Sequence, residues 1–346
     1  MPKAINCAIA AILASAYVAV SASAAQAPPP PKTYGGAKLS RFATGLKNPT
    51  SFAFGDGAMF AGDSGNSSKI PNGGVYVIKN GKGIEIPNSP IFVGGMTFHA
   101  GALYLSGGVL GSTGPVWTIQ KWTGWNGTTF TNRKVLYTAP TGFQGFNGVA
   151  FGPGGRLYVG VDTGLQNDND HGPASLSPYL YDILSMTASG GSVKVYASGI
   201  RQPWQMAYDA KANALFTSDL GQDSGAEHPP DFLLLVHKGD NYDFPKCNWT
   251  KGSKCSGATK PFQMFSPHFD PMGVALVGKT LYLGSFAGAH AKGGGALYAI
   301  PVAGGKPKPV VTGFPAETDA LAYNGGYLYV GGSTNKGAGV VFRVKP

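Results

Sequence analysis

The chain has 346 residues, of which 43% are hydrophobic, 12% aromatic and only 13% charged, and its formal net charge at pH 7 is +10. The aromatic content excludes a disordered chain, and the low charge excludes a coiled coil. The 53 glycines follow no three-residue period, which excludes collagen. A chain rich in glycine, proline and aromatic residues favours an all-β fold.

The first 24 residues have the features of a secretory signal peptide. Lys3 supplies the positive charge, and residues 8–20 form an uncharged stretch of 13 residues. Residues 22–24 (Ala-Ser-Ala) form a cleavage site, and residues 25–27 (Ala-Gln-Ala) are a second candidate. The uncharged stretch is too short to span a bilayer, and no later stretch is apolar enough. We therefore expect a secreted or periplasmic protein with no membrane span.

After the signal peptide, residues 25–37 are predicted to form a proline-rich tether and residues 38–346 a single domain. Cys247 and Cys255 lie in a polar loop, and in an oxidising compartment they are expected to form a local disulfide. A metal site is the weaker alternative because no further cysteine or histidine has zinc spacing nearby. The basic residues are scattered, which favours a solvated surface over a nucleic-acid partner. An anionic polymer of the cell envelope stays a candidate partner.

A short strand of the form Leu-Tyr-Val-Gly recurs six times along the chain. The copies begin at Met59, Leu103, Leu157, Leu215, Leu281 and Leu328. Strands are predicted before them at residues 51–54, 96–98, 148–151, 206–208, 273–276 and 320–323, each followed by a tight turn. Third strands are predicted at 75–78, 116–119, 180–183, 233–236, 296–300 and 341–344, and fourth strands at 135–137, 193–196 and 309–311. This repeat predicts a six-bladed β-propeller.

The last repeat ends after its third strand, whereas residues 41–46 near the start resemble the end of a fourth strand. We expect residues 39–44 to supply the outer strand of the sixth blade, so that an N-terminal strand closes the ring and protects the sheet edges. A β-sandwich or an open array of sheets is the alternative.

The loops between second and third strands lie on the same face as the connections between blades. They carry most of the polar residues, so this face is the predicted functional one. The loops are expected to place there Asp63, Asp162, Asp168, Asp170, His171, Asp219, Gln222, Asp223, Glu227, His228 and His290. The connections are expected to add Asn48, Gln144, Asn147, Arg201, Gln202, His268, Asp270, Glu317 and Asp319.

Arg201 and His268 each precede an inner strand, at the entrance to the central channel. Arg201 is suited to hold a carboxylate with two parallel hydrogen bonds, although a structural ion pair between two blades is the alternative. Residues 168–170 (Asp-Asn-Asp) indicate either a site for a hard cation such as Ca²⁺ or a solvated polar loop.

Five segments form a distinctive group of motifs. They are residues 151–159 (Phe-Gly-Pro-Gly-Gly-Arg-Leu-Tyr-Val), 199–204 (Gly-Ile-Arg-Gln-Pro-Trp), 219–223 (Asp-Leu-Gly-Gln-Asp), 239–245 (Gly-Asp-Asn-Tyr-Asp-Phe-Pro) and 267–273 (Pro-His-Phe-Asp-Pro-Met-Gly). Together they resemble the glucose/sorbosone dehydrogenase family. Its members are soluble six-bladed propellers that oxidise aldoses with pyrroloquinoline quinone (PQQ) and Ca²⁺. Outside these segments the chain agrees with the family only in its blade pattern.

The resemblance implies roles for several residues. Arg201 and Gln202 match positions that contact the quinone or the substrate. The carbonyls of Gly221 and Gln222 match those that approach the cofactor-bound Ca²⁺. Two further positions, Asp231 and Tyr242, match those that hold a structural Ca²⁺ in some members of the family.

The chain also departs from the family at the catalytic base. Gln144, or a neighbour in residues 143–147, stands where the family has a histidine. Glutamine cannot accept the hydroxyl proton that is released when a sugar is oxidised, so Gln144 is left with a cofactor-binding role. His171 and His268 are the candidate replacements as the base.

The sequence thus favours a divergent PQQ-dependent dehydrogenase acting on a small-molecule sugar or related alcohol, with Ca²⁺ as a second cofactor. Two alternatives stay open. The first is a non-catalytic secreted propeller that binds a glycan or an envelope partner. The second is a Ca²⁺-dependent lactonase or esterase.

Overall fold

The computed structural model describes residues 30–66, 72–112, 114–140, 143, 145–162, 179–222, 229–267, 269–286, 294–334 and 336–346. Within these ranges the chain forms β-strands and one short 3-10 turn, Pro153–Gly155. None of the described segments is a helix long and apolar enough to cross a membrane. The predicted signal peptide lies outside the described residues.

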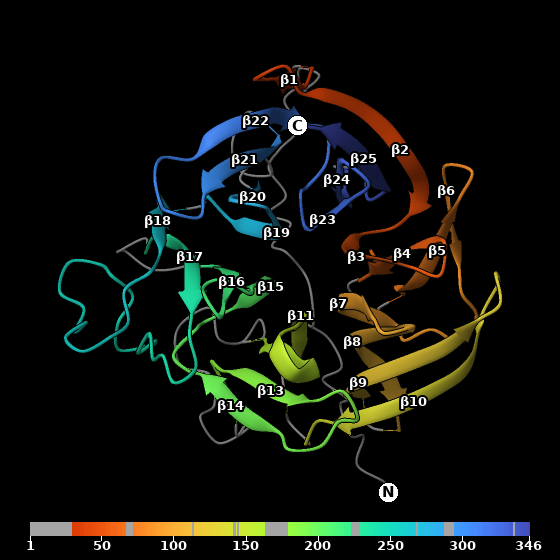
Figure 1. Ribbon diagram of the computed structural model, residues 1–346, viewed down its shortest axis with the longest axis horizontal. Coiled ribbons are helices and arrows are strands. Elements are labelled where there is room, and N and C mark those ends of the chain that lie inside the picture. The colour runs from red at the N-terminus through yellow and green to blue at the C-terminus, as the bar shows by residue number, and fades with distance from the viewer. Residues whose placement is uncertain are drawn as a thin grey trace, which may run out of the picture.

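The strands form six blades that surround a common centre (Figure 1). Blade one consists of β3 (Pro49–Gly55), β4 (Ala58–Asp63), β5 (Gly74–Lys79) and β6 (Lys82–Glu85). Blade two consists of β7 (Phe92–His99), β8 (Ala102–Gly111), β9 (Gly114–Trp125) and β10 (Phe130–Thr138). Blade three consists of β11 (Phe146–Phe151), β12 (Arg156–Val161), β13 (Ile183–Thr187) and β14 (Lys194–Ala197). Blade four consists of β15 (Pro203–Asp209), β16 (Ala214–Asp219), β17 (Asp231–Val236) and β18 (Gln263–Phe265). Blade five consists of β19 (Pro271–Val277), β20 (Thr280–Ser285), β21 (Gly295–Pro301) and β22 (Lys308–Phe314). Blade six is β23 (Ala320–Asn324), β24 (Tyr327–Ser333), β25 (Gly339–Lys345) and β2 (Lys38–Leu46). The protein is therefore an all-β, six-bladed propeller.

The N-terminal strand β2 pairs antiparallel with β25, so the outer strand of the sixth blade comes from the beginning of the chain. Thr44 of β2 also pairs with Lys82 of β6, which joins the sheets of blades six and one. Before it, β1 (Lys32–Thr33) pairs with β22 and adds a fifth strand to blade five. Two residues of the predicted tether thus belong to a sheet.

Among the described residues, the hydrophobic clusters lie at the six interfaces between neighbouring blades. Phe60 of blade one packs with Leu103 and Trp122 of blade two, and equivalent clusters fill the other interfaces. The cluster between blades six and one joins Val341 to Phe52. The recurring Leu-Tyr strand produces this arrangement because alternate residues of a strand point to opposite faces of its sheet, one toward each neighbouring blade.

The inner strands interrupt their pairing at one level of the channel. Register shifts occur near the beginning of β3, β7, β11, β15 and β19. Side chains of one blade bond to the next at this level: Ser106 Oγ donates to the carbonyl of Asn147, and Ser218 Oγ to that of Met272. Polar contacts thus add to the hydrophobic packing between blades.

One predicted strand was displaced. The third strand of blade three was expected at residues 180–183, but β13 begins at Ile183. The reason is local, because Tyr181 has a φ of 68°, which no strand accommodates. The other third strands include the predicted residues. Tight turns at the hairpins are also confirmed: Asp56 and Gly57 both have positive φ, as a two-residue hairpin requires.

Candidate active site

The face at which the inner strands begin carries a group of buried carboxylic acids. Asp63 and Asp219 are the last residues of β4 and β16, the second strands of blades one and four. Asp162 directly follows β12, the second strand of blade three. Asp270 and Asp319 each precede an inner strand. All five side chains are buried, so their charges depend on the hydrogen bonds and the neighbouring groups that surround them.

Arg201 lies just before β15 and is only 5% exposed. Its Nη1 donates to the carbonyl of Gly221 at 2.7 Å and to that of Leu220 at 3.0 Å. These carbonyls belong to the segment that follows β16, the second strand of the same blade. They fix the orientation of the guanidinium group, and the segment is in turn tied to it.

Asp219 lies beside this arginine in the fold. Its Oδ1 accepts the backbone N–H of Gln202 at 2.7 Å. Burial raises the pKa of Asp219 to about 7, although the bond from Gln202 and the charge of Arg201 favour the ionised form. Burial thus favours the protonated form of this carboxyl group more than it would for an exposed aspartate.

Asp231 organises the backbone around these residues. Its Oδ1 accepts the N–H of Gly221 at 2.7 Å, and its Oδ2 accepts the N–H of Asp270 at 3.0 Å. One carboxylate thus connects the segment that holds Arg201 to the entry into blade five. Backbone donors take up both oxygens that the family resemblance would give to calcium.

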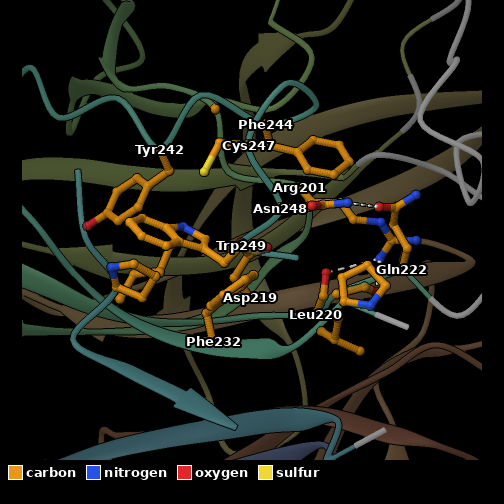
Figure 2. A pocket seen from close by; sticks show the side chains of 15 residues that line it. Arg201, Asp219, Leu220, Gln222, Phe232, Tyr242, Phe244, Cys247, Asn248 and Trp249 are labelled. Carbon is orange, nitrogen blue, oxygen red and sulfur yellow. Dashed lines mark hydrogen bonds between the residues drawn. The ribbon is translucent and has the colours of Figure 1, made fainter. Parts of the chain in front are cut away.

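A small pocket lies next to Arg201 and Asp219, and Figure 2 shows its lining. The lining also includes Gly199, residues of β17, the segment after β16 with Gln222, and the long loop between β17 and β18 with Tyr242 and Trp249. Its free volume is about 20 Å³, which is enough for about one water molecule.

The long loop of blade four forms one wall of the pocket. The predicted disulfide between Cys247 and Cys255 is present in this loop. Asn248 follows the first cysteine and points toward Gln222, whose Oε1 accepts a hydrogen bond from Asn248 Nδ2 at 3.2 Å (Figure 2). The hydroxyl of Tyr242 donates to the carbonyl of Leu235 at 3.0 Å, so it is directed into the blade.

The structure brings most of the predicted site residues together. Arg201, Gly221, Gln222 and Tyr242 line the same pocket, while Gln202 and Asp231 bond to groups at its edge. Gln144, His171 and His268 lie outside the described residues, as do Asp168 and Asp170. Within the described part of the chain, no group of three or more His, Cys, Asp or Glu residues has a metal-binding arrangement.

The sequence analysis missed two features of this face. The first is the contribution of Asn248 and Trp249 to the pocket, for which the cysteines on either side were the only signal. The second is the interaction between Glu317 and Asp319, which were both expected on this face but not as a pair of neighbouring acids. The pKa values of both are raised, chiefly by burial, and the charge of Glu317 further raises that of Asp319.

Solved structures share the fold over nearly the whole chain. A putative oxidoreductase (glucose dehydrogenase) from Thermus thermophilus is 21% identical, with a TM-score of 0.69 over 89% of this chain and 100% of that one. The soluble aldose sugar dehydrogenase from Escherichia coli, in its apo form, is 17% identical, with a TM-score of 0.69 over 90% and 99%. The PQQ domain of pyranose dehydrogenase from Coprinopsis cinerea is 14% identical, with a TM-score of 0.65 over 92% and 97%.

The sequence itself gives no such match. No protein-family model matches the chain, and no curated protein matches it. The similarity to the solved structures therefore establishes the propeller fold of sugar dehydrogenases for this chain. Its activity has to be argued from its own residues.

Proposed function

We propose that this protein is a divergent sugar dehydrogenase that uses a carboxylate-bearing quinone of the PQQ type at the face of Arg201. The observation that carries the proposal is the buried guanidinium of Arg201, oriented by the carbonyls of Leu220 and Gly221. A buried, oriented guanidinium is the group best suited to bind a carboxylate. The motifs around residues 199–204 and 219–223, and the fold shared with glucose and aldose sugar dehydrogenases, support the same assignment.

The residues present fit the quinone better than they fit calcium. The pocket holds about one water molecule, so we assign the fused rings to a position outside it, with only a carboxylate reaching Arg201. The carbonyl of Gly221, a predicted calcium ligand, already accepts a hydrogen bond from this guanidinium. A divalent cation on the same oxygen would be repelled by the arginine, so we derive no step through calcium.

The chemistry then divides between the cofactor and the chain. A bound quinone would supply a two-electron acceptor for oxidation of the sugar at C1, where a hydroxyl group also has to lose its proton. Arg201 would bind and orient the cofactor. His171 or His268 stays the predicted acceptor of the hydroxyl proton, because Gln144 cannot take it. The substrate class is a neutral aldose or a related alcohol.

The decisive experiment has a binding arm and an activity arm. Purified protein is titrated with PQQ, with and without Ca²⁺, while the cofactor absorbance and the melting temperature are followed. Turnover of an aldose panel is then measured with an artificial electron acceptor. A ligand that binds the native state raises the melting temperature. Binding that Arg201→Ala abolishes, with turnover in the wild type, is the expected result.

A matched control variant is Arg156→Ala. Arg156 begins β12 at the opposite face, where it donates to Ser185 Oγ and to the carbonyl of Ser192. It should leave cofactor binding unchanged. Absence of any shift with saturating PQQ in the wild type would overturn the proposal. Binding without turnover would instead favour a non-catalytic propeller, which the glutamine at position 144 already motivates.

A further inference from the structure

A second, larger cavity occupies the central channel on the face opposite Arg201. Its volume is about 360 Å³, within the range of small-molecule binding sites. Its walls come from all six inner strands, β3, β7, β11, β15, β19 and β23, which surround the centre in Figure 1. The lining extends from the middle of each strand toward its hairpin end, for example from Gln205 to Tyr208 in β15.

Gln205 separates this cavity from the face of Arg201. Its side chain extends from blade four across the channel, where Nε2 donates to the carbonyl of Thr50 in blade one. Its Oε1 accepts the backbone N–H groups of Val274 at 3.3 Å and Leu321 at 3.4 Å, in blades five and six. The cavity is thus a funnel that has a polar floor and opens at the hairpin face.

The wall of the funnel is polar but uncharged. Each inner strand is the last strand of its sheet, so one edge of its backbone has no strand partner and borders the channel. These edges present N–H donors and carbonyl acceptors around the cavity. Among the described lining residues none is Asp, Glu, Lys or Arg. A charged ligand would therefore lose its hydration without gaining a counter-charge.

Aromatic side chains border the opening of the funnel. Phe151, Tyr208 and Tyr323 occupy equivalent places near the ends of β11, β15 and β23, and all three line the cavity. Tyr323 is 42% exposed. The hydroxyl of Tyr208 donates to Asn213 Oδ1 at 2.7 Å, and the ring of Phe151 stacks on that of His99 at 4.0 Å. Two of the three rings are therefore held in place at the border of the cavity.

We propose that this funnel, the hairpin-face cavity, is a binding site for a neutral saccharide. A sugar ring carries several hydroxyl groups, each able to donate and accept, which matches a wall of backbone donors and acceptors. Its C–H faces match the aromatic rings at the opening. Its lack of charge matches the uncharged lining. The proposal does not depend on the proposed dehydrogenase activity, because Gln205 and Trp204 lie between the two faces.

Two methionines allow the site to be located directly. Met96 and Met206 line the funnel, whereas Met186 is buried between blades two and three and Met264 lies on the outer strand of blade four. Protein labelled with ¹³C at the methionine methyl groups is titrated with glucose, mannose, N-acetylglucosamine and short neutral oligosaccharides. Replacement of each methionine by leucine assigns the signals. Binding in the funnel should shift the signals of Met96 and Met206 and leave those of Met186 and Met264 unchanged.

Variants then test the chemistry. Tyr323→Ala should weaken binding by about fivefold or more, the loss expected when an aromatic contact is removed. Tyr327→Ala is the matched control, because Tyr327 is in the same hairpin but packs against Arg343 outside the cavity. Glucuronate, which has the same ring with a carboxylate, should bind more weakly than glucose. Arg201→Ala should leave the binding intact.

Three results would overturn the proposal. One is the absence of any methionine shift at millimolar concentrations of every neutral sugar. Another is a shift that Tyr323→Ala and Tyr208→Ala both leave unchanged. The third is loss of sugar binding in Arg201→Ala, which would place the sugar on the opposite face and assign it to the proposed dehydrogenase site instead.

Discussion

The side-chain amide of Gln205, in blade four, donates a hydrogen bond to the backbone carbonyl of Thr50, in blade one. The two residues are 155 positions apart in the sequence and on different sides of the channel. The residue before Gln205 makes a second crossing, since Trp204 Nε1 donates to the carbonyl of Asp319 in blade six at 3.3 Å. The inner strand of blade four therefore ties together blades that do not adjoin it in the ring.

Replacing Gln205 by leucine tests how much the hydrogen bonds of its side chain contribute to the free energy of unfolding. The substitution leaves the carbonyl of Thr50 and the N–H groups of Val274 and Leu321 without their amide partner. Buried groups that lose a hydrogen bond cost about 1–3 kcal/mol. Urea unfolding should therefore show a loss of stability of about that size. Gln263→Leu, at the half-buried outer strand β18, is the control and should change stability by less than about 0.5 kcal/mol.

A second prediction concerns the close approach of inner strands β11 and β15. A Cβ atom on Gly148 would collide with the carbonyl oxygen of Trp204 and would lie 2.8 Å from the Cα of Gln205. Both contacts are with backbone, so no side chain can move aside. Gly148→Ala should lower the free energy of unfolding by about 1–3 kcal/mol, the usual cost of overpacking. An unchanged melting temperature would contradict the close packing of these strands.

Gly191→Ala is a suitable control for that experiment. Gly191 lies in the turn before β14, where an added Cβ would meet only Thr187 Oγ1 at 3.5 Å, an ordinary contact. Its φ is outside the left-handed region. The alanine should therefore be tolerated there. The difference in the free energy of unfolding between the two variants then isolates the effect of the close approach of β11 and β15.

The blades could be predicted from the sequence because their signals are local. Leu103-Tyr104 and its equivalents repeat in phase, and each turn needs only its own glycine or asparagine. The contacts of Gln205 could not be predicted, since they join residues that no local pattern relates. The candidate site was likewise predictable only where its signal was local. The position of Arg201 followed from a motif, whereas its bond to Gly221 depends on the register between β15 and β16.

The displaced third strand of blade three shows a related limit. The position of residues 180–183 in the repeat predicted a strand, but the backbone at Tyr181 turns into the left-handed region. The N–H of Ile200 bonds to the carbonyl of Tyr181 at 2.9 Å, so this segment is held by the connection into blade four. A tertiary hydrogen bond thus accompanies a local conformation that the pattern of residues did not reveal.

The third prediction concerns the disulfide of blade four. Cys247 and Cys255 are eight residues apart and close a short loop, one end of which lines the pocket beside Arg201. Crosslinks over loops of this size stabilise proteins by about 2–3 kcal/mol through the unfolded chain. The double variant Cys247→Ala, Cys255→Ala should lose about that much in urea unfolding. The wild type should reach the same value with reductant, and reductant should not affect the variant.

The disulfide should also matter for the site itself. Trp249 follows the buried Cys247 and lines the same pocket. If the crosslink holds this wall in place, the double variant should bind PQQ more weakly than the wild type even at temperatures where both are folded. Equal affinity in the two proteins would mean that the loop keeps its conformation without the crosslink.

The last prediction concerns the pH dependence of stability. Asp319 is buried beside Glu317, whose Oε2 accepts a hydrogen bond from Ser333 Oγ at 2.7 Å. Burial raises the pKa of Asp319 well above 3.8, and the charge of Glu317 raises it further, against the effect of Asn48. Above pH 3.8 the unfolded chain releases a proton that the folded protein still holds. Stability therefore falls as the pH rises from the pKa of Asp319 in the unfolded chain to its pKa in the folded protein, by about 1.4 kcal/mol for each pH unit between them.

Asp319→Asn removes this ionisation while it keeps the shape of the side chain. Its melting temperature should decrease less than that of the wild type between about pH 4 and pH 8, because asparagine has no proton to release. Asp56→Asn, in an exposed hairpin, controls for the loss of one negative charge and should follow the wild-type profile. Parallel profiles for wild type and Asp319→Asn would show that the carboxyl group ionises as easily in the folded protein as in the unfolded chain. In that case the two acids could not share a poorly hydrated environment next to the channel.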